Sequence, residues 1–156
     1  PRYQEIPGAQ IPKETSADGL VTVRVIAGEA MGQRAVIETR TPIIYLHYQI
    51  KPGGVANQLV PSDYNTFAYI VEGEGSFGAE SERATDGQMV LFAQDGNEVT
   101  IKNPVEAKAT LDVLLIGGLP LNEPIARYGP FVMNTEQEIH QAFEDYRLGR
   151  MGAIDR

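Results

Sequence analysis

The sequence predicts an all-β domain, an antiparallel sandwich or barrel, with one α-helix near its C-terminal end. Short stretches of alternating apolar and polar residues recur about every 10 to 15 residues, with turn-forming residues between them. Close to the C-terminus, apolar residues instead recur at helical spacing. The length of 156 residues suits one ordinary domain, which buries roughly two thirds of its unfolded surface.

The composition excludes several classes of partner and site. The chain has 13 basic and 21 acidic residues, a formal net charge of -8, which disfavours direct binding to nucleic acid or anionic lipid. The absence of cysteine excludes disulfides, thiolate metal sites and cysteine nucleophiles. No apolar run approaches the roughly 20 residues of a membrane span, and no signal pattern stands at the N-terminus. We therefore expect a cytoplasmic protein, or a nuclear one if the organism is a eukaryote.

The chain divides into three parts by composition. Residues 1–19 contain three prolines and little periodicity, and we expect an N-terminal segment or linker there. Residues 20–118 hold the predicted barrel, and residues 119–156 form a C-terminal extension. The predicted strands cover residues 20–26, 35–39, 43–50, a short stretch ending at Val60, 66–71, 87–93, 98–101 and 107–116.

Residues 43–50 form the clearest predicted strand. One face is apolar throughout and consists of Ile44, Leu46, Tyr48 and Ile50, while the other consists of Tyr45, His47 and Gln49. This alternation is typical of a strand with one face in the core.

Residues 53–73 predict a β-hairpin. A short strand ends at Val60, and residues 61–65, PSDYN, combine a proline with Asp and Asn, which are turn-forming residues. A second strand, residues 66–71, follows the turn.

The C-terminal extension predicts a helix over about residues 135–148. Thr135 and Glu138 have the spacing of a capping box, and Gly149 suits the end of the helix. The apolar stripe consists of Ile139, Ala142, Phe143 and Tyr146. A helix this short is marginal alone, so we expect it to pack on another part of the protein.

A small apolar cluster precedes this helix. It consists of Tyr128, Phe131, Val132 and Met133, in a segment rich in turn formers. These side chains either cover the open end of the barrel or meet a partner, and we favour the partner.

Residues 73–78 spell G-x-G-x-x-G after a predicted strand, with Asp95 about twenty residues further on. A dinucleotide site would also need a helix at the third glycine. The residues that follow, AESERATDG, are too short and polar for one, so we expect a tight turn with positive φ. Glu72 and Glu74 flank Gly73 and are interpreted as solvated acids rather than a glycosidase pair.

The chain has two histidines. His47 lies in a predicted strand without a second ligand two residues away, and we expect a hydrogen-bonded structural histidine. His140 is four residues from both Glu136 and Glu144, a spacing typical of ion pairs on a solvated helix face.

Residues 53–73 also resemble the first motif of the cupin superfamily, G-x5-H-x-H-x4-E-x6-G, whose His and Glu residues hold a metal. The glycines match Gly53 and Gly73, but the ligand positions hold Leu59, Pro61 and Thr66. The second cupin motif, laid on residues 87–103 with one extra residue, places Val99 at the fourth ligand position. We expect a cupin-type double-stranded β-helix barrel in which these four vacant positions line the pocket, with no catalytic, cofactor-binding or metal-binding residue.

Residues 120–152, PLNEPIARYGPFVMNTEQEIHQAFEDYRLGRMG, resemble the C-terminal end of pirins. The stretches PRYQEIPGAQIPK and TPIIYLHYQIKPGG resemble the start and middle of the second pirin domain. The resemblance implies a bicupin whose N-terminal cupin holds iron, with this chain as the metal-free C-terminal half and that cupin as its partner. The implied activities of the whole protein are quercetin 2,3-dioxygenation and transcriptional co-regulation through protein partners.

Three hypotheses follow. The first is a metal-free half that supports the iron-binding half. The second is a dioxygenase acting alone, which requires His47, His140 or nearby acids to converge on a metal. The third is a stand-alone cupin module without catalysis, whose interior near Leu59, Pro61, Thr66 and Val99 binds a flavonol-like molecule.

Overall fold

The computed structural model describes residues 4–152, and the chain divides into two compact units after Pro120. The first unit holds the strands β1 to β12, and the second holds a β-hairpin and the helix. The predicted fold class, all-β with one C-terminal helix, is confirmed.

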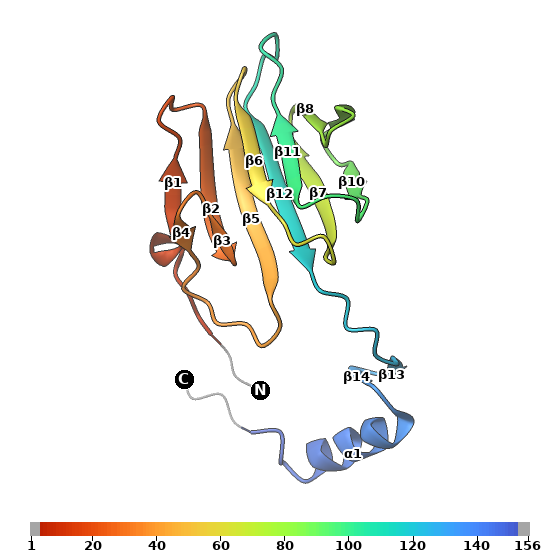
Figure 1. The fold of residues 1–156 in the computed structure, drawn as a ribbon. Helices are drawn as coiled ribbons and strands as arrows, with labels where there is room; N and C mark the ends of the chain where they lie inside the picture. Colours follow the sequence, from red (N-terminus) through yellow and green to blue (C-terminus); the bar gives the residue numbers. More distant parts are fainter. Residues whose placement is uncertain (1–3, 153–156) are drawn as a thin grey trace. The chain divides into compact units, whose positions relative to one another are not determined.

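The first unit is built from two antiparallel sheets (Figure 1). The six-stranded sheet has the order β1 (Lys13–Thr15), β2 (Val21–Ala27), β5 (Ile43–Ile50), β12 (Leu111–Gly118), β7 (Asn65–Glu72) and β10 (Met89–Phe92). The four-stranded sheet has the order β6 (Val55–Leu59), β11 (Glu98–Lys102), β8 (Glu74–Phe77) and β9 (Glu82–Thr85). The short strands β3 (Glu29–Ala30) and β4 (Gln33–Arg34) form a separate ribbon.

The core draws side chains from both sheets. In β5, Leu46, Tyr48 and Ile50 are buried while the residues between them are half-buried, as the alternation predicts. Phe77 and Ile101 come from the four-stranded sheet and are almost wholly inaccessible. Each large apolar side chain buried in this way stabilises the fold by about 1.5–3 kcal/mol.

The predicted hairpin over residues 53–73 is wrong. Strands β6 and β7 follow each other along the chain but lie in different sheets, β6 paired with β11 and β7 with β12 and β10. The turn residues are the expected ones, with Tyr64 donating its backbone N–H to Pro61 at 3.1 Å. The chain uses this turn to cross from one sheet to the other, which residue types alone do not reveal.

The predicted strand over residues 35–39 is also absent, and residues 29–34 form the β3–β4 ribbon instead. At Glu38, a side chain makes backbone hydrogen bonds of the kind that a neighbouring strand would otherwise make. Gln4 donates from Nε2 to the Glu38 carbonyl at 2.9 Å and accepts from the Glu38 N–H at 3.3 Å. The N-terminal segment contributes further, since Lys13–Thr15 adds an edge strand to the six-stranded sheet.

The G-x-G-x-x-G stretch is a strand bounded by two glycines and contains no helix. Gly73 and Gly78 have φ of 91° and 71°, while Glu74–Phe77 between them forms β8. The two positive φ values agree with the expected turn, but they occur only at the two glycines that bound the strand. The acids Glu72 and Glu74 are both exposed.

The second unit consists of α1 (Glu136–Arg147) and the hairpin of β13 (Ala126–Tyr128) and β14 (Phe131–Met133). The capping box is confirmed, because Thr135 accepts from the Glu138 N–H and the Glu138 carboxylate accepts from the Thr135 N–H. Phe143 contacts Phe131 and Tyr128 edge to face, with ring centroids 5.0 and 5.7 Å apart. Within residues 4–152, no helix is both long and apolar enough to span a bilayer.

Candidate functional site

The interior of the barrel is where the cupin alignment places its four ligand positions. Leu59 is 68% exposed and Pro61 is also exposed, so neither side chain faces the interior. The buried residues of this segment are Ala56, Gln58 and Val60. Because side chains alternate along a strand, the motif spacing is displaced by one residue from the inward face of β6.

Thr66 and Val99, the other two positions, are buried at 7% and 5% exposure. Val99 pairs with Gln58 across β11 and β6, and Thr66 pairs with Gly117 across β7 and β12. The Thr66 hydroxyl lies so close to Gly117 that an added Cβ there would be 2.8 Å from its oxygen. This hydroxyl has no hydrogen-bond partner among the described residues, and such a buried group costs about 1–3 kcal/mol.

A buried polar pair occupies the interior. The Tyr48 hydroxyl donates to Gln58 Oε1 at 2.8 Å, and Gln58 Nε2 donates to the carbonyls of Leu59 and Glu29 at 2.9 and 3.2 Å. Burial raises the pKa of the Tyr48 phenol above its usual range. Sequence reasoning missed Gln58, although it is the single polar residue in the inward row of β6.

These interior side chains do not fit an iron ion. Iron in such a barrel needs imidazole and carboxylate ligands, whereas the interior offers an alkyl group, a hydroxyl and a Tyr–Gln hydrogen bond. Across residues 4–152, no group of three or more His, Asp or Glu side chains could hold a metal. The arrangement supports packing and supplies neither a general base nor a metal-bound nucleophile.

The two histidines lie in different units and have different surroundings. His47 is a hydrogen-bonded histidine, as predicted, with Nε2 at 2.6 Å from Asp112 Oδ1 on the side of the sheet away from the core. His140 is exposed on α1 and forms no ion pair with Glu136 or Glu144 in the described part of the chain. Within each unit, as far as residues 4–152 describe it, neither histidine belongs to a group of three or more His, Asp or Glu side chains that could hold a metal.

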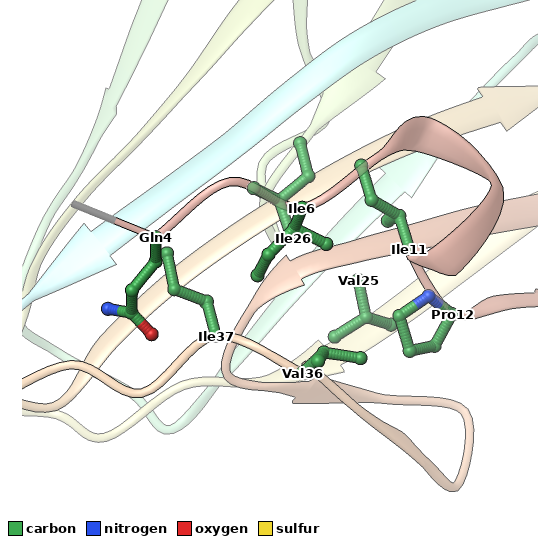
Figure 2. A pocket seen from close by; sticks show the side chains of 8 residues that line it. All are labelled: Gln4, Ile6, Ile11, Pro12, Val25, Ile26, Val36 and Ile37. Carbon is green, nitrogen blue, oxygen red and sulfur yellow. The ribbon is translucent and has the colours of Figure 1, made fainter. Parts of the chain in front are cut away.

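A small apolar cavity lies at the N-terminal side of the six-stranded sheet (Figure 2). Its volume is about 140 Å³. It is lined by Gln4, Ile6, Ile11, Pro12, Val25, Ile26, Val36 and Ile37, and by none of the four vacant ligand positions. Figure 2 shows that aliphatic side chains from the N-terminal segment, β2 and residues 36–37 surround it. Of its lining, Gln4 alone has a polar side chain.

The fold defines a class of protein, a cupin-type β-barrel, and its interior holds apolar side chains and a hydrogen-bonded Tyr48–Gln58 pair. Over residues 45–152 the chain matches the model of the pirin C-terminal cupin domain. It therefore belongs to the pirin C-terminal cupin domain family.

Individual relatives agree with this assignment. A pirin-like protein from Solanum lycopersicum is 45% identical over 97% of this chain and 51% of its own length. Pirin from Homo sapiens is 37% identical with the same coverage. A quercetin 2,3-dioxygenase from Acinetobacter baumannii superposes with a TM-score of 0.82 at 30% identity, over 99% of this chain and 52% of that protein. The chain spans about half the length of the curated relatives it matches.

Proposed function

We propose that this chain acts as the metal-free C-terminal half of a pirin-like protein and supports an iron-binding N-terminal cupin half by docking to it. The observation that carries the proposal is the composition of the barrel interior. It holds Val99, Thr66 and the hydrogen-bonded Tyr48–Gln58 pair, which are not the imidazole and carboxylate side chains that bind iron. Any catalysis then belongs to the other half. The similarity to a quercetin 2,3-dioxygenase supports flavonol dioxygenation as the activity of the whole protein. Co-regulation of transcription through protein partners rests on family resemblance alone.

Metal content and melting temperature test this proposal. The purified chain is incubated with Fe²⁺ and desalted, and its iron is measured by elemental analysis. The N-terminal half of a pirin relative, produced separately, is then added and the melting temperature is recorded. We expect far less than one iron per chain and a melting temperature that rises with the concentration of the added half, since a ligand of the native state stabilises it. One tightly held iron per chain, or unchanged melting, would contradict the proposal.

A second candidate function is that of a small-ligand-binding module without catalysis. The cavity lined by Ile6, Ile11, Val25 and their neighbours supports it, because an apolar cavity of about 150 Å³ can hold a benzene-sized molecule. Binding of toluene, followed by NMR shifts of the methyl groups that line the cavity, tests this function. Ile11→Phe would fill the cavity and should abolish the shifts, while Leu59→Phe, on the exposed face of β6, should leave them unchanged. Equal shifts in the unaltered chain and in Ile11→Phe would contradict it.

The setting that suits this function is the cytoplasm, or the nucleus if the organism is a eukaryote. A chain with a net charge of -8 and without cysteine is compatible with a reducing compartment. Fluorescence microscopy of the tagged full-length protein would test the location.

A further inference from the structure

The sequence contains three Asp–Gly pairs, Asp18–Gly19, Asp86–Gly87 and Asp95–Gly96. In such a pair the backbone nitrogen of the glycine can attack the side-chain carboxyl carbon of the aspartate, because glycine has no Cβ to obstruct the approach or restrict the backbone. The attack needs a protonated carboxyl group and a glycine N–H that is not held in a hydrogen bond. Since the residues are the same in all three pairs, differences in reactivity come from the folded structure.

Hydrogen bonds restrain the first two pairs. The Gly19 N–H donates to the Ser16 carbonyl at 2.8 Å. The Gly87 N–H donates to the Ile70 carbonyl at 2.9 Å. The Ser16 hydroxyl also donates to Asp18 Oδ1, which lowers the pKa of this carboxyl group and with it the protonated fraction at neutral pH. Reaction at either pair must therefore first break a native hydrogen bond of the glycine N–H.

The third pair has no such restraint. Asp95 and Gly96 lie in the connection between β10 and β11, residues 93–97, and both are exposed. Within residues 4–152 the Gly96 N–H has no hydrogen-bond acceptor and the Asp95 carboxylate has no donor. A Cβ built on Gly96 would meet nothing within 4 Å, so there is room beside the backbone for a new ring. Exposed loop tips of this kind are also where the backbone moves most freely.

We propose that Asp95 is a site of spontaneous isomerisation to isoaspartate. The Gly96 nitrogen loses its proton and bonds to Asp95 Cγ, and the carboxyl oxygen leaves as water, which closes a five-membered succinimide ring. Water then adds to the main-chain carbonyl carbon of Asp95 and breaks its bond to the Gly96 nitrogen. The main chain now runs through Cγ, and the former main-chain carbonyl is a carboxylate on Cα. One water is lost and one is gained, so the reaction needs no oxidant, cofactor or enzyme.

The site lies between two anchors of the turn that carries the chain from one sheet to the other. On one side, Gln94 Nε2 donates to the Asp63 carbonyl at 3.1 Å and to Asn65 Oδ1 at 3.2 Å. On the other side, the Asn97 carbonyl accepts from the Val60 N–H at 2.9 Å. Isomerisation adds one methylene carbon to the main chain between these anchors. The longer connection cannot keep both sets of bonds in their present geometry, so the crossing turn loosens.

Digestion with endoproteinase Asp-N measures the reaction at each pair, because this protease cleaves before aspartate but not before isoaspartate. The purified chain is kept at pH 7 and body temperature for several weeks, and the uncleaved fraction at each pair is measured by mass spectrometry against fresh protein. We expect Asp95 to react about fivefold faster than Asp18 or Asp86, the factor that corresponds to one net hydrogen bond. In urea, where the native bonds are absent, the three rates should become similar. Equal rates in the folded chain, or reaction at Asp95 only after unfolding, would overturn the proposal.

Gly96→Ala is the matched variant. Gly96 is not among the glycines with positive φ, so alanine fits its backbone, while the added Cβ obstructs attack by the nitrogen. We expect this variant to slow the reaction at Asp95 several-fold and to leave the other two pairs unchanged, and an unchanged rate at Asp95 would overturn the proposal. Amide exchange at Val60 then tests the effect on the crossing turn. Exchange should accelerate in the aged chain but not in aged Gly96→Ala, and unchanged exchange in chains that contain isoaspartate would overturn the link to this turn.

Discussion

His47 Nε2 lies 2.6 Å from Asp112 Oδ1, a hydrogen bond between neighbouring strands on the outer face of the six-stranded sheet. Both side chains are 21% exposed. Their contribution to stability depends on water, because a pair in contact with solvent typically contributes about 0–1 kcal/mol, whereas breaking a fully buried pair costs about 3–5 kcal/mol. Because both side chains keep contact with solvent, the contribution of this bond is expected to lie in the lower range.

A double-mutant cycle on His47→Gln and Asp112→Asn measures the contribution of this bond. We expect a coupling energy below about 1 kcal/mol from urea unfolding, because both side chains contact water. A coupling of about 3 kcal/mol or more would contradict this expectation and would mean that the pair behaves as a fully buried one.

Tyr48→Phe tests the buried pair in the interior. The variant leaves Gln58 Oε1 without its donor, so we expect a loss of about 1–2 kcal/mol in unfolding free energy at pH 7. Burial raises the pKa of Tyr48 above its ordinary value of 10.0, so the neutral phenol stabilises the fold below pH 10 and this contribution is lost as the pH rises further. Above pH 10 the stability of the unaltered chain should fall more steeply than that of the variant, by up to about 1.4 kcal/mol per pH unit. Parallel urea-unfolding curves for both proteins from pH 8 to pH 11 would contradict this reading.

The sequence was sufficient for features that depend on neighbouring residues. The two faces of residues 43–50 follow from strict alternation, and the capping box follows from Thr135 and Glu138 at a fixed spacing. Both are local, and both are confirmed. The partner of each strand is not local. The turn at residues 61–65 would serve a hairpin or a crossing between sheets equally well, and pairing of β6 with β11 decides between them.

The sequence predicted what kind of side chains fill the barrel interior, but not which residues of β6 face it. The cupin motif counts residues between glycines, and its spacing placed Leu59 and Pro61 inside although both are exposed. The alternation of Ala56, Gln58 and Val60 carried the correct register, because one misplaced residue reverses every side chain of a strand. The bond between Tyr48 and Gln58 joins two strands in different sheets, which a pattern along the chain does not contain.

Comparing Gly73→Ala with Gly78→Ala separates the cost of a positive φ from the cost of steric contact with the added Cβ. Both glycines have positive φ, which costs an alanine roughly 1–2 kcal/mol. At Gly73 a Cβ would also lie 3.0 Å from the Thr110 carbonyl oxygen, whereas at Gly78 the nearest atom, on Phe92, is 3.9 Å away. We expect both variants to lower the unfolding free energy and Gly73→Ala to lower it more. Equal losses in urea unfolding would mean that the Thr110 backbone moves aside without cost.

The N-terminus of α1 carries the last prediction, which concerns the second unit alone. The Glu138 carboxylate accepts from the backbone N–H groups of Thr135 and Asn134 at 2.9 and 3.1 Å, and the Thr135 hydroxyl accepts from the Glu138 N–H at 3.2 Å. A helix of 12 residues is marginal by itself, so loss of the cap should appear as opening of its first turns. Thr135→Ala removes one side of the box and should cost about 1 kcal/mol.

Glu136→Gln is the matched control for this prediction. Glu136 shares the favourable charge of the first turn with Glu138 but is not part of the capping box, so its loss should cost only about 0.3 kcal/mol. Amide hydrogen exchange over residues 136–147 measures both variants. We expect Thr135→Ala to accelerate exchange about fivefold and Glu136→Gln less than twofold, with residues 43–50 unchanged in both. Equal acceleration by the two variants would show that helix charge, and not the reciprocal hydrogen bonds, holds this end of α1 closed.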